Sequence, residues 1–195
     1  MTKTVEFFFD IVSLASYLAW TQLPDLAQRC GAEIRWRPML LGGVFKATGN
    51  ISPVAVPAKG RYMVRDMTRF AERYGVALNM NPHFPINSLH LMRGATALLD
   101  TPDFHPYLKT LFEGMWVERR DMSDPDTVAD CLARADIDPS GFQALIQDET
   151  VKQRLRVTTE EAVERGAFGA PTFFVDGEMF FGQDRLDFVR EALSA

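Results

Sequence analysis

The stretch Gly166-Ala-Phe-Gly-Ala-Pro-Thr-Phe-Phe174 carries the strongest information about the fold of this chain. Its glycines end a helical segment and bend the chain, so that Pro171 stands directly before an apolar strand at 172–175. An Asp-Gly pair then forms a hairpin turn into a second strand at 178–181. Because a cis peptide bond is cheap only before proline, we predict a cis bond before Pro171. Such a turn exposes the backbone of Ala170, which can pair with an extended peptide ligand.

The N-terminal end of the chain has the pattern strand, helix, strand. Residues 5–9 are a nearly continuous apolar run, as in a central strand that is covered on both faces. Ser13 is a good N-cap for a helix to about Arg29, with a glycine as its stop. Residues 34–38 alternate apolar and basic side chains and end in proline, which predicts a half-buried strand.

The middle of the chain is mostly helical in pattern. Residues 41–60 contain four glycines and two prolines and are expected to form a long loop. Helical patterns follow at about 60–74, 87–100, 104–118, 125–134, 139–147 and 148–165. The chain closes with strand, turn, strand and a helix that Asp184 is expected to cap. The fold class is therefore α/β, a thioredoxin-like fold with a large helical insertion. We expect a thioredoxin-like domain made of 1–45 plus 150–195, and an inserted helical domain at 46–149.

Composition narrows the range of partners. The chain has 195 residues, 47% hydrophobic and 24% charged, which is ordinary for a globular protein. A net charge of −5 argues against a nucleic-acid or anionic-membrane partner. No apolar run approaches the roughly 20 residues of a membrane span, and no signal-peptide core is evident.

Cys30 and Cys131 form no Cys-x-x-Cys pair, so we expect reduced, buried thiols in a cytoplasmic protein. The three histidines lack metal-ligand spacing, and no metal site is expected.

The helix start at Ser13 is the first candidate for chemistry. A thiol oxidoreductase of this fold would carry Cys-x-x-Cys here, whereas this chain reads Ser13-Leu-Ala-Ser16, which excludes a dithiol cycle at this position. A serine hydroxyl at a helix N-terminus can donate a hydrogen bond to a bound thiolate. The simpler alternative is that Ser13 only caps the helix.

A second candidate is the segment Gly182-Gln183-Asp184-Arg185 before the last helix. Its functional interpretation is a pocket for an amino-acid head group. Asp184 would pair with the ammonium, and backbone N–H groups would bind the carboxylate. The alternative is an ordinary helix start with a solvated Arg185.

A third candidate is the glycine-rich segment that contains Lys46 and Asn50. Walker A spacing and its Gly-Lys-Ser/Thr ending are absent, which argues against phosphate binding of that type. Both side chains could instead bind a substrate carboxylate, although a surface lysine is the commoner situation for such a residue.

Together these segments resemble one family. The opening Phe9-Asp-Ile-Val-Ser-Leu-Ala-Ser-Tyr-Leu-Ala19 is similar to that family's Phe-Asp-x-x-Ser-Pro-Tyr-Ser-Tyr-Leu. Further matching segments follow in order: Leu41–Asn50, Lys59-Gly-Arg61-Tyr62, Phe84–Ser88 with Arg93, Gly166–Thr172 and Gly182–Arg185. The family is the 2-hydroxychromene-2-carboxylate isomerases, with their relatives the kappa-class glutathione transferases.

The resemblance implies glutathione as the cofactor. It maps the serine that touches the glutathione sulfur onto Ser13, and the residue that pairs with the cysteinyl backbone onto Ala170, before Pro171. The segment 182–185, with Asp184 and Arg185, maps near the γ-glutamyl group, and the loop asparagine maps to Asn50. The resemblance also implies a small-molecule substrate and a homodimer.

The implied activity is a glutathione-dependent isomerisation of an aromatic-degradation carboxylate by reversible thiolate addition. Ser13 would be the catalytic residue, and Lys46 and Asn50 would hold the substrate. One alternative is a kappa-like glutathione transferase that conjugates electrophiles, and another is a non-catalytic binder of thiol peptides. Leu14 and Ala15 replace the family's usual Pro and Tyr, a departure that bears on the substrate more than on the cofactor.

Overall fold

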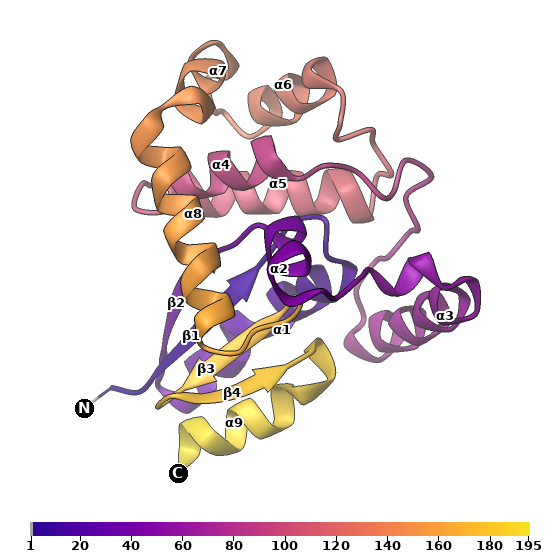
Figure 1. The fold of residues 1–195 in the computed structure, drawn as a ribbon, viewed down its shortest axis with the longest axis vertical. Coiled ribbons are helices and arrows are strands. Elements are labelled where there is room, and N and C mark those ends of the chain that lie inside the picture. The colour runs from indigo at the N-terminus through magenta and orange to yellow at the C-terminus, as the bar shows by residue number, and fades with distance from the viewer. Residues whose placement is uncertain (1) are drawn as a thin grey trace.

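A mixed four-stranded sheet forms the centre of the molecule (Figure 1). The computed structural model describes residues 2–195. The strands are β1 (Thr4–Phe9), β2 (Glu33–Pro38), β3 (Thr172–Val175) and β4 (Glu178–Phe181), in the order β2-β1-β3-β4. β1 pairs parallel with β2 and antiparallel with β3, and β3 pairs antiparallel with β4. The apolar run at 5–9 thus lies in a central strand, as predicted.

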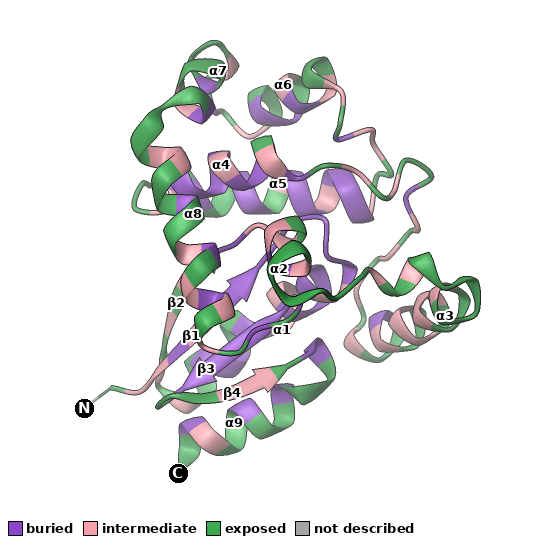
Figure 2. Cartoon of the chain, in the orientation of Figure 1, coloured by how far each residue is buried: buried purple, intermediate pink, exposed green. Residues whose placement is uncertain are grey.

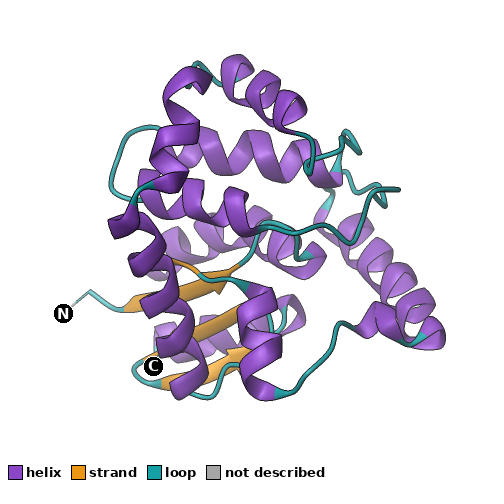
Figure 3. Ribbon diagram, turned by 45° about the horizontal axis from the view of Figure 1, so that its top comes forward, coloured by secondary structure: helices purple, strands orange, loops and turns teal. Residues whose placement is uncertain are grey.

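Helices surround this sheet and build a second layer beyond it (Figure 3). They are α1 (Leu14–Cys30), α2 (Leu41–Thr48), α3 (Pro57–Tyr74), α4 (Leu89–Leu98), α5 (Phe104–Trp116), α6 (Pro125–Arg134), α7 (Pro139–Gln147), α8 (Glu149–Glu164) and α9 (Leu186–Ser194). Two short 3-10 turns lie at Pro53–Ala55 and Gln183–Arg185. No helix of the part that the structure describes has the length and apolar character to cross a bilayer. The predicted α/β, thioredoxin-like fold class with a helical insertion is confirmed.

Both faces of the central strands β1 and β3 are buried, whereas the edge strands β2 and β4 are partly exposed (Figure 2). Because side chains alternate along a strand, Phe7 packs on the face covered by α1 and α9, and Phe8 on the opposite face. The Phe7 ring stacks on Phe173 of β3, with 5.2 Å between the ring centroids. Phe8 meets Phe174 edge to face at 5.5 Å. The aromatic run in β1 therefore anchors two cores at once.

The inserted helices share the core of the sheet. The indole Nε1 of Trp116 in α5 donates a hydrogen bond to the Ile11 carbonyl at 2.9 Å. One continuous cluster of buried apolar residues runs from the sheet into α4, α5, α6 and α7. All four strands come from outside the segment 46–149. The predicted boundary at 45/46 falls inside α2, and the division into two domains stays a prediction.

The prediction of a long loop at 41–60 is wrong. Residues 41–48 form α2, a 3-10 turn follows, and α3 already begins at Pro57. The first N–H of α2, from Leu41, donates to the Asp10 carboxylate at 2.8 Å, and Val44 is fully buried. The hydrogen bond to Asp10, which lies 31 residues earlier in the chain, stabilises this helix together with packing against α8. These contacts outweigh the low helix propensity of its glycines.

The prediction that Asp184 caps the last helix is also wrong. Asp184 lies in the 3-10 turn before α9, and no side chain caps that helix. Its carboxylate pairs instead with the guanidinium of Arg185. Gly182, with φ of 100°, begins this turn, a conformation that glycine adopts without strain.

Candidate active site

Ser13 lies where the start of α1 meets the loop before β3. Its hydroxyl oxygen accepts a hydrogen bond from the Ser16 N–H at 3.1 Å, which confirms the predicted helix cap. The same hydroxyl donates to the carbonyl of Ala170 at 3.0 Å. Ser13 is 7% exposed, so a ligand that reaches the hydroxyl must enter a confined space. The residue therefore has a second contact, across 157 positions of sequence, that capping does not require.

The loop before β3 presents a free backbone donor beside Ser13. The Ala170–Pro171 bond is cis, as predicted. The Ala170 carbonyl accepts from Ser13, while its N–H has no hydrogen-bond partner among residues 2–195. A Cβ at Gly169 would lie 2.7 Å from the Phe181 ring, so a larger residue there would displace that ring. A free donor in a fixed loop is suited to pairing with the backbone of a peptide-like ligand.

The segment 182–185 is joined to the same loop. The Gly182 N–H donates to the Pro171 carbonyl at 3.0 Å. Gln183 is 1% exposed, and its Oε1 accepts from the Tyr74 hydroxyl of α3 at 2.8 Å. The Nε2 of Gln183 is buried and has no partner in the described chain. Burial raises the pKa of Tyr74, so this phenol stays a hydrogen-bond donor at neutral pH.

The two predicted substrate residues lie in different surroundings. The Asn50 side chain donates to the Phe168 carbonyl at 2.9 Å, which ties the end of α2 to the loop before β3. Lys46 lines a groove of about 900 Å³ between α2, α4 and α8, together with Arg93 and Lys152. Ser13 and Ala170 do not line this groove. The structure thus groups Asn50 with the Ser13 site and directs Lys46 to a neighbouring surface.

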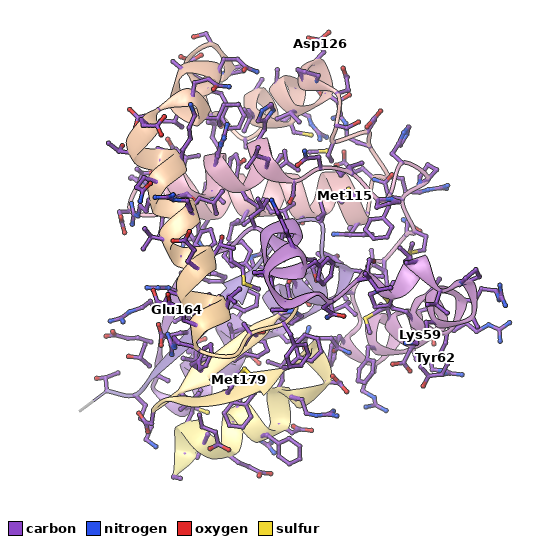
Figure 4. The ribbon with its side chains drawn as sticks, in the orientation of Figure 1. Lys59, Tyr62, Met115, Asp126, Glu164 and Met179 are labelled. Atoms are coloured by element: carbon purple, nitrogen blue, oxygen red, sulfur yellow. The ribbon has the colours of Figure 1, made fainter. Side chains whose placement is uncertain are left out.

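α3 lies beside this site. Figure 4 shows that α3, on which Lys59 and Tyr62 are labelled, stands out from the body of the molecule. The last residue of α3, Tyr74, contacts Gln183 in the turn before α9. Tyr62 is 62% exposed, and the basic-aromatic start of α3 is therefore accessible to a ligand. The site lies between the thioredoxin-like sheet and α3.

Asp10 is a buried carboxyl near the site that the sequence analysis did not single out. It is fully buried directly after β1, three residues before Ser13. Burial raises the pKa of its carboxyl to about 6, against hydrogen bonds that lower it. An aspartate placed between apolar neighbours, Phe9 and Ile11, is the signal that could have identified it, because buried carboxyls are rare.

Comparisons with known proteins identify the family of this chain. A model of the DSBA-like thioredoxin domain matches residues 4–194. A 2-hydroxychromene-2-carboxylate isomerase from Sphingobium xenophagum is 31% identical over 195 residues, covering 99% of each chain. Glutathione S-transferase kappa 1 from Homo sapiens is 29% identical, covering 99% of this chain and 92% of the human protein.

Solved structures place the fold in the same group. A 2-hydroxychromene-2-carboxylate isomerase structure superposes with a TM-score of 0.84 at 30% identity, covering 97% of this chain and 94% of the other. A probable DsbA oxidoreductase from Streptomyces coelicolor has a TM-score of 0.78 at 18% identity, over 98% of this chain and 88% of the other, and shares the fold alone. This chain therefore belongs to the DSBA-like thioredoxin-domain family, among the 2-hydroxychromene-2-carboxylate isomerases and their kappa-class glutathione transferase relatives.

Proposed function

We propose that this chain is a glutathione-dependent isomerase of the 2-hydroxychromene-2-carboxylate isomerase type, acting on an aromatic-degradation carboxylate. The observation that carries the proposal is the position of the Ser13 hydroxyl, which lies at the N-terminus of α1 and 3.0 Å from the Ala170 carbonyl. A hydroxyl donor, a helix N-terminus and a free backbone donor meet there, and each of them favours a bound anion.

The residues around Ser13 fit glutathione. The unpaired N–H of Ala170 suits the cysteinyl backbone, and the carbonyl of the same residue is within reach of the ligand once Ser13 turns away. The buried, unpartnered Nε2 of Gln183 suits the γ-glutamyl carboxylate, and Asp184 beside it suits the ammonium. When bound, glutathione would supply a thiolate that adds reversibly to a conjugated carbon.

In this proposal each protein group has a separate task. Ser13 donates to the sulfur and, with the N-terminus of α1, holds it as the thiolate. Gly182 fixes the segment before α9 by its hydrogen bond to the Pro171 carbonyl, so that the γ-glutamyl end is held at a constant distance from Ser13. Asn50 lies beside the Ser13 site, and Lys46 lines the neighbouring groove between α2, α4 and α8. In this proposal the substrate carboxylate therefore extends from the sulfur past Asn50 into that groove, where Lys46 orients it.

The decisive experiment measures glutathione binding and glutathione consumption in the same preparation. Calorimetric titration with glutathione should give saturable binding that Ser13→Ala alters. Turnover of a hydroxychromene carboxylate should require glutathione and leave its concentration unchanged. The proposal is refuted if wild-type protein shows no binding of glutathione, or if turnover is independent of it.

A kappa-like glutathione transferase is the second candidate. The kappa-class relative is nearly as similar as the isomerase, at 29% against 31% identity. Leu14 and Ala15, the latter half-buried, stand where the isomerases usually carry Pro and Tyr, and the smaller Ala15 leaves more room beside the sulfur. Conjugation would consume one glutathione per turnover, so the consumption assay separates the two activities. We further propose that the enzyme acts as a cytoplasmic homodimer, which sedimentation and fractionation would test.

A further inference from the structure

The Asp10 carboxyl connects the starts of three helices. Its Oδ1 accepts from the Val12 N–H at 3.1 Å, in the turn that leads into α1. Its Oδ2 accepts from the Leu41 N–H at the start of α2 and from the Ser88 hydroxyl just before α4, both at 2.8 Å. Asp10 is fully buried. Hydrogen-bond donors from the starts of three helices therefore meet on one carboxyl group.

No cation pairs with this carboxyl in the described chain. The causes that act on the pKa of Asp10 are burial and these three hydrogen bonds alone. The charged or titratable side chains on the three helices are Tyr17, Asp25, Arg29 and Cys30 of α1, Lys46 of α2, and His90 and Arg93 of α4. None of them makes a hydrogen bond or an ion pair with Asp10, since Tyr17 donates to the Ala77 carbonyl and Lys46 lines the groove towards α8. Two backbone N–H groups and the Ser88 hydroxyl are therefore the contacts that offset the burial of this carboxyl.

The same turn fixes Ser13. The Ser13 N–H donates to the backbone carbonyl of Asp10 at 3.0 Å. The backbone of Ile11 is held as well, because its N–H donates to the Met92 sulfur at 3.3 Å and its carbonyl accepts from Trp116. Any shift of the Asp10 side chain thus moves the turn that aims the Ser13 hydroxyl.

We propose that Asp10 is a positioning residue for Ser13, whose carboxylate holds the β1–α1 turn against the starts of α2 and α4 so that the Ser13 hydroxyl points at the bound sulfur. This inference rests on the proposed glutathione function. The ionised carboxylate accepts from all three donors. A protonated carboxyl carries a hydrogen on one oxygen, and the contacts to Leu41 and Ser88 then compete with that proton.

The pH dependence of turnover should therefore report the protonation state of Asp10. With a pKa of about 6, Asp10 is ionised at neutral pH and protonated below about pH 5. Turnover should rise with pH along an inflection that belongs to Asp10, in addition to any inflection of the bound thiol. Asparagine resembles the protonated carboxyl, because only one of its two terminal atoms accepts a hydrogen bond.

The experiment compares three variants with wild type. Asp10→Asn should lower kcat roughly ten-fold at neutral pH and remove the Asp10 inflection, with the glutathione dissociation constant changed less than about three-fold. Ser88→Ala keeps the charge but removes one donor to it, so the inflection should move to higher pH. Thr96→Val, at a buried threonine in the middle of α4, controls for the loss of a buried hydroxyl and should leave the pH profile unchanged.

The ¹³C resonance of the Asp10 carboxyl, followed against pH in the protein without ligand, shows which inflection in turnover belongs to Asp10. The Asp10 resonance should titrate near pH 6, and the amide resonances of Val12 and Leu41 should move with the same midpoint. The inference is overturned if wild type binds glutathione and turns over, yet Asp10→Asn keeps the wild-type kcat and pH profile. It is also overturned if the amide resonances of Val12 and Leu41 do not shift as the Asp10 carboxyl titrates. If wild type does not bind glutathione, the proposed function is refuted instead. The amide titration then still tests whether the Asp10 carboxylate positions the β1–α1 turn.

Discussion

Replacing Ser13 with alanine separates the capping role of this residue from its proposed role at the sulfur. The substitution removes the hydrogen bond from the Ser16 N–H and the one to the Ala170 carbonyl. Loss of a cap costs about 0.5–2 kcal/mol, and loss of a neutral hydrogen bond about 0.5–1.5 kcal/mol. The free energy of unfolding should therefore fall by about 1–3.5 kcal/mol. In a chain of this size that corresponds to a melting temperature lower by roughly 2–14 °C.

The effect on the thiol has a different origin. The hydroxyl carries a single proton, so in the complex it must leave the Ala170 carbonyl to donate to the sulfur. A hydrogen bond to a charged group is worth about 1.5–3 kcal/mol. Ser13→Ala should thus raise the pKa of the bound thiol by about one to two units. Turnover near pH 7 should fall roughly 10- to 100-fold.

Two variants serve as controls for Ser13→Ala. Ser16→Ala removes a buried hydroxyl of the same helical turn that has no hydrogen-bond partner, and it retains the N–H that bonds to Ser13. Asp124→Ala removes the N-cap of α6, far from the site, and reproduces a capping loss alone. Thiolate absorbance titrated against pH, with melting curves on the same samples, reads both effects. If Ser13→Ala lowers the melting temperature as Asp124→Ala does but leaves the thiolate titration unchanged, the proposed contact with the sulfur is wrong.

Three further predictions concern the neighbouring groups. Asp184→Ala should weaken glutathione binding about ten-fold while the melting temperature stays near that of wild type, because Asp184 pairs only with its exposed neighbour and caps nothing; Asp187→Ala is the matched control, and equal affinities in the two variants would contradict the head-group pocket. Lys46→Met should raise the KM of the carboxylate substrate about ten-fold with little change in kcat. Lys152→Met, in the same groove, should leave the KM unchanged. Steady-state kinetics measure both, and equal effects would remove Lys46 from the substrate site. Because the pKa of Asp10 is raised from 3.8 to about 6, the folded state binds more protons than the unfolded state in that range. Wild type should therefore lose about 3 kcal/mol of stability relative to Asp10→Asn as the pH rises from about 3 to 7. Parallel denaturant-unfolding curves across that range would show that Asp10 is not perturbed.

The sequence alone determined the elements that have local causes. The apolar run at 5–9 identified the central strand, because only a strand covered on both faces tolerates three consecutive phenylalanines. Ser13 and the glycine at 31 marked the ends of α1, since a cap and a left-handed stop act within one turn of the helix. The cis bond before Pro171 was likewise readable, because it depends on the proline and the bend before it.

Contacts between distant residues decided the rest. α2 was missed because its first N–H is satisfied by Asp10, which no pattern within 41–48 reveals. The expected cap at Asp184 failed because Gly182 and its bond to the Pro171 carbonyl set the path of the chain there. The sequence identified Ser13 and Ala170 as separate candidates for the site. Their contact joins residues 157 positions apart and forms only after β1 and β3 pair. Local signals fix where elements begin and end, whereas the site forms from hydrogen bonds and burial that only the packed sheet and helices bring together.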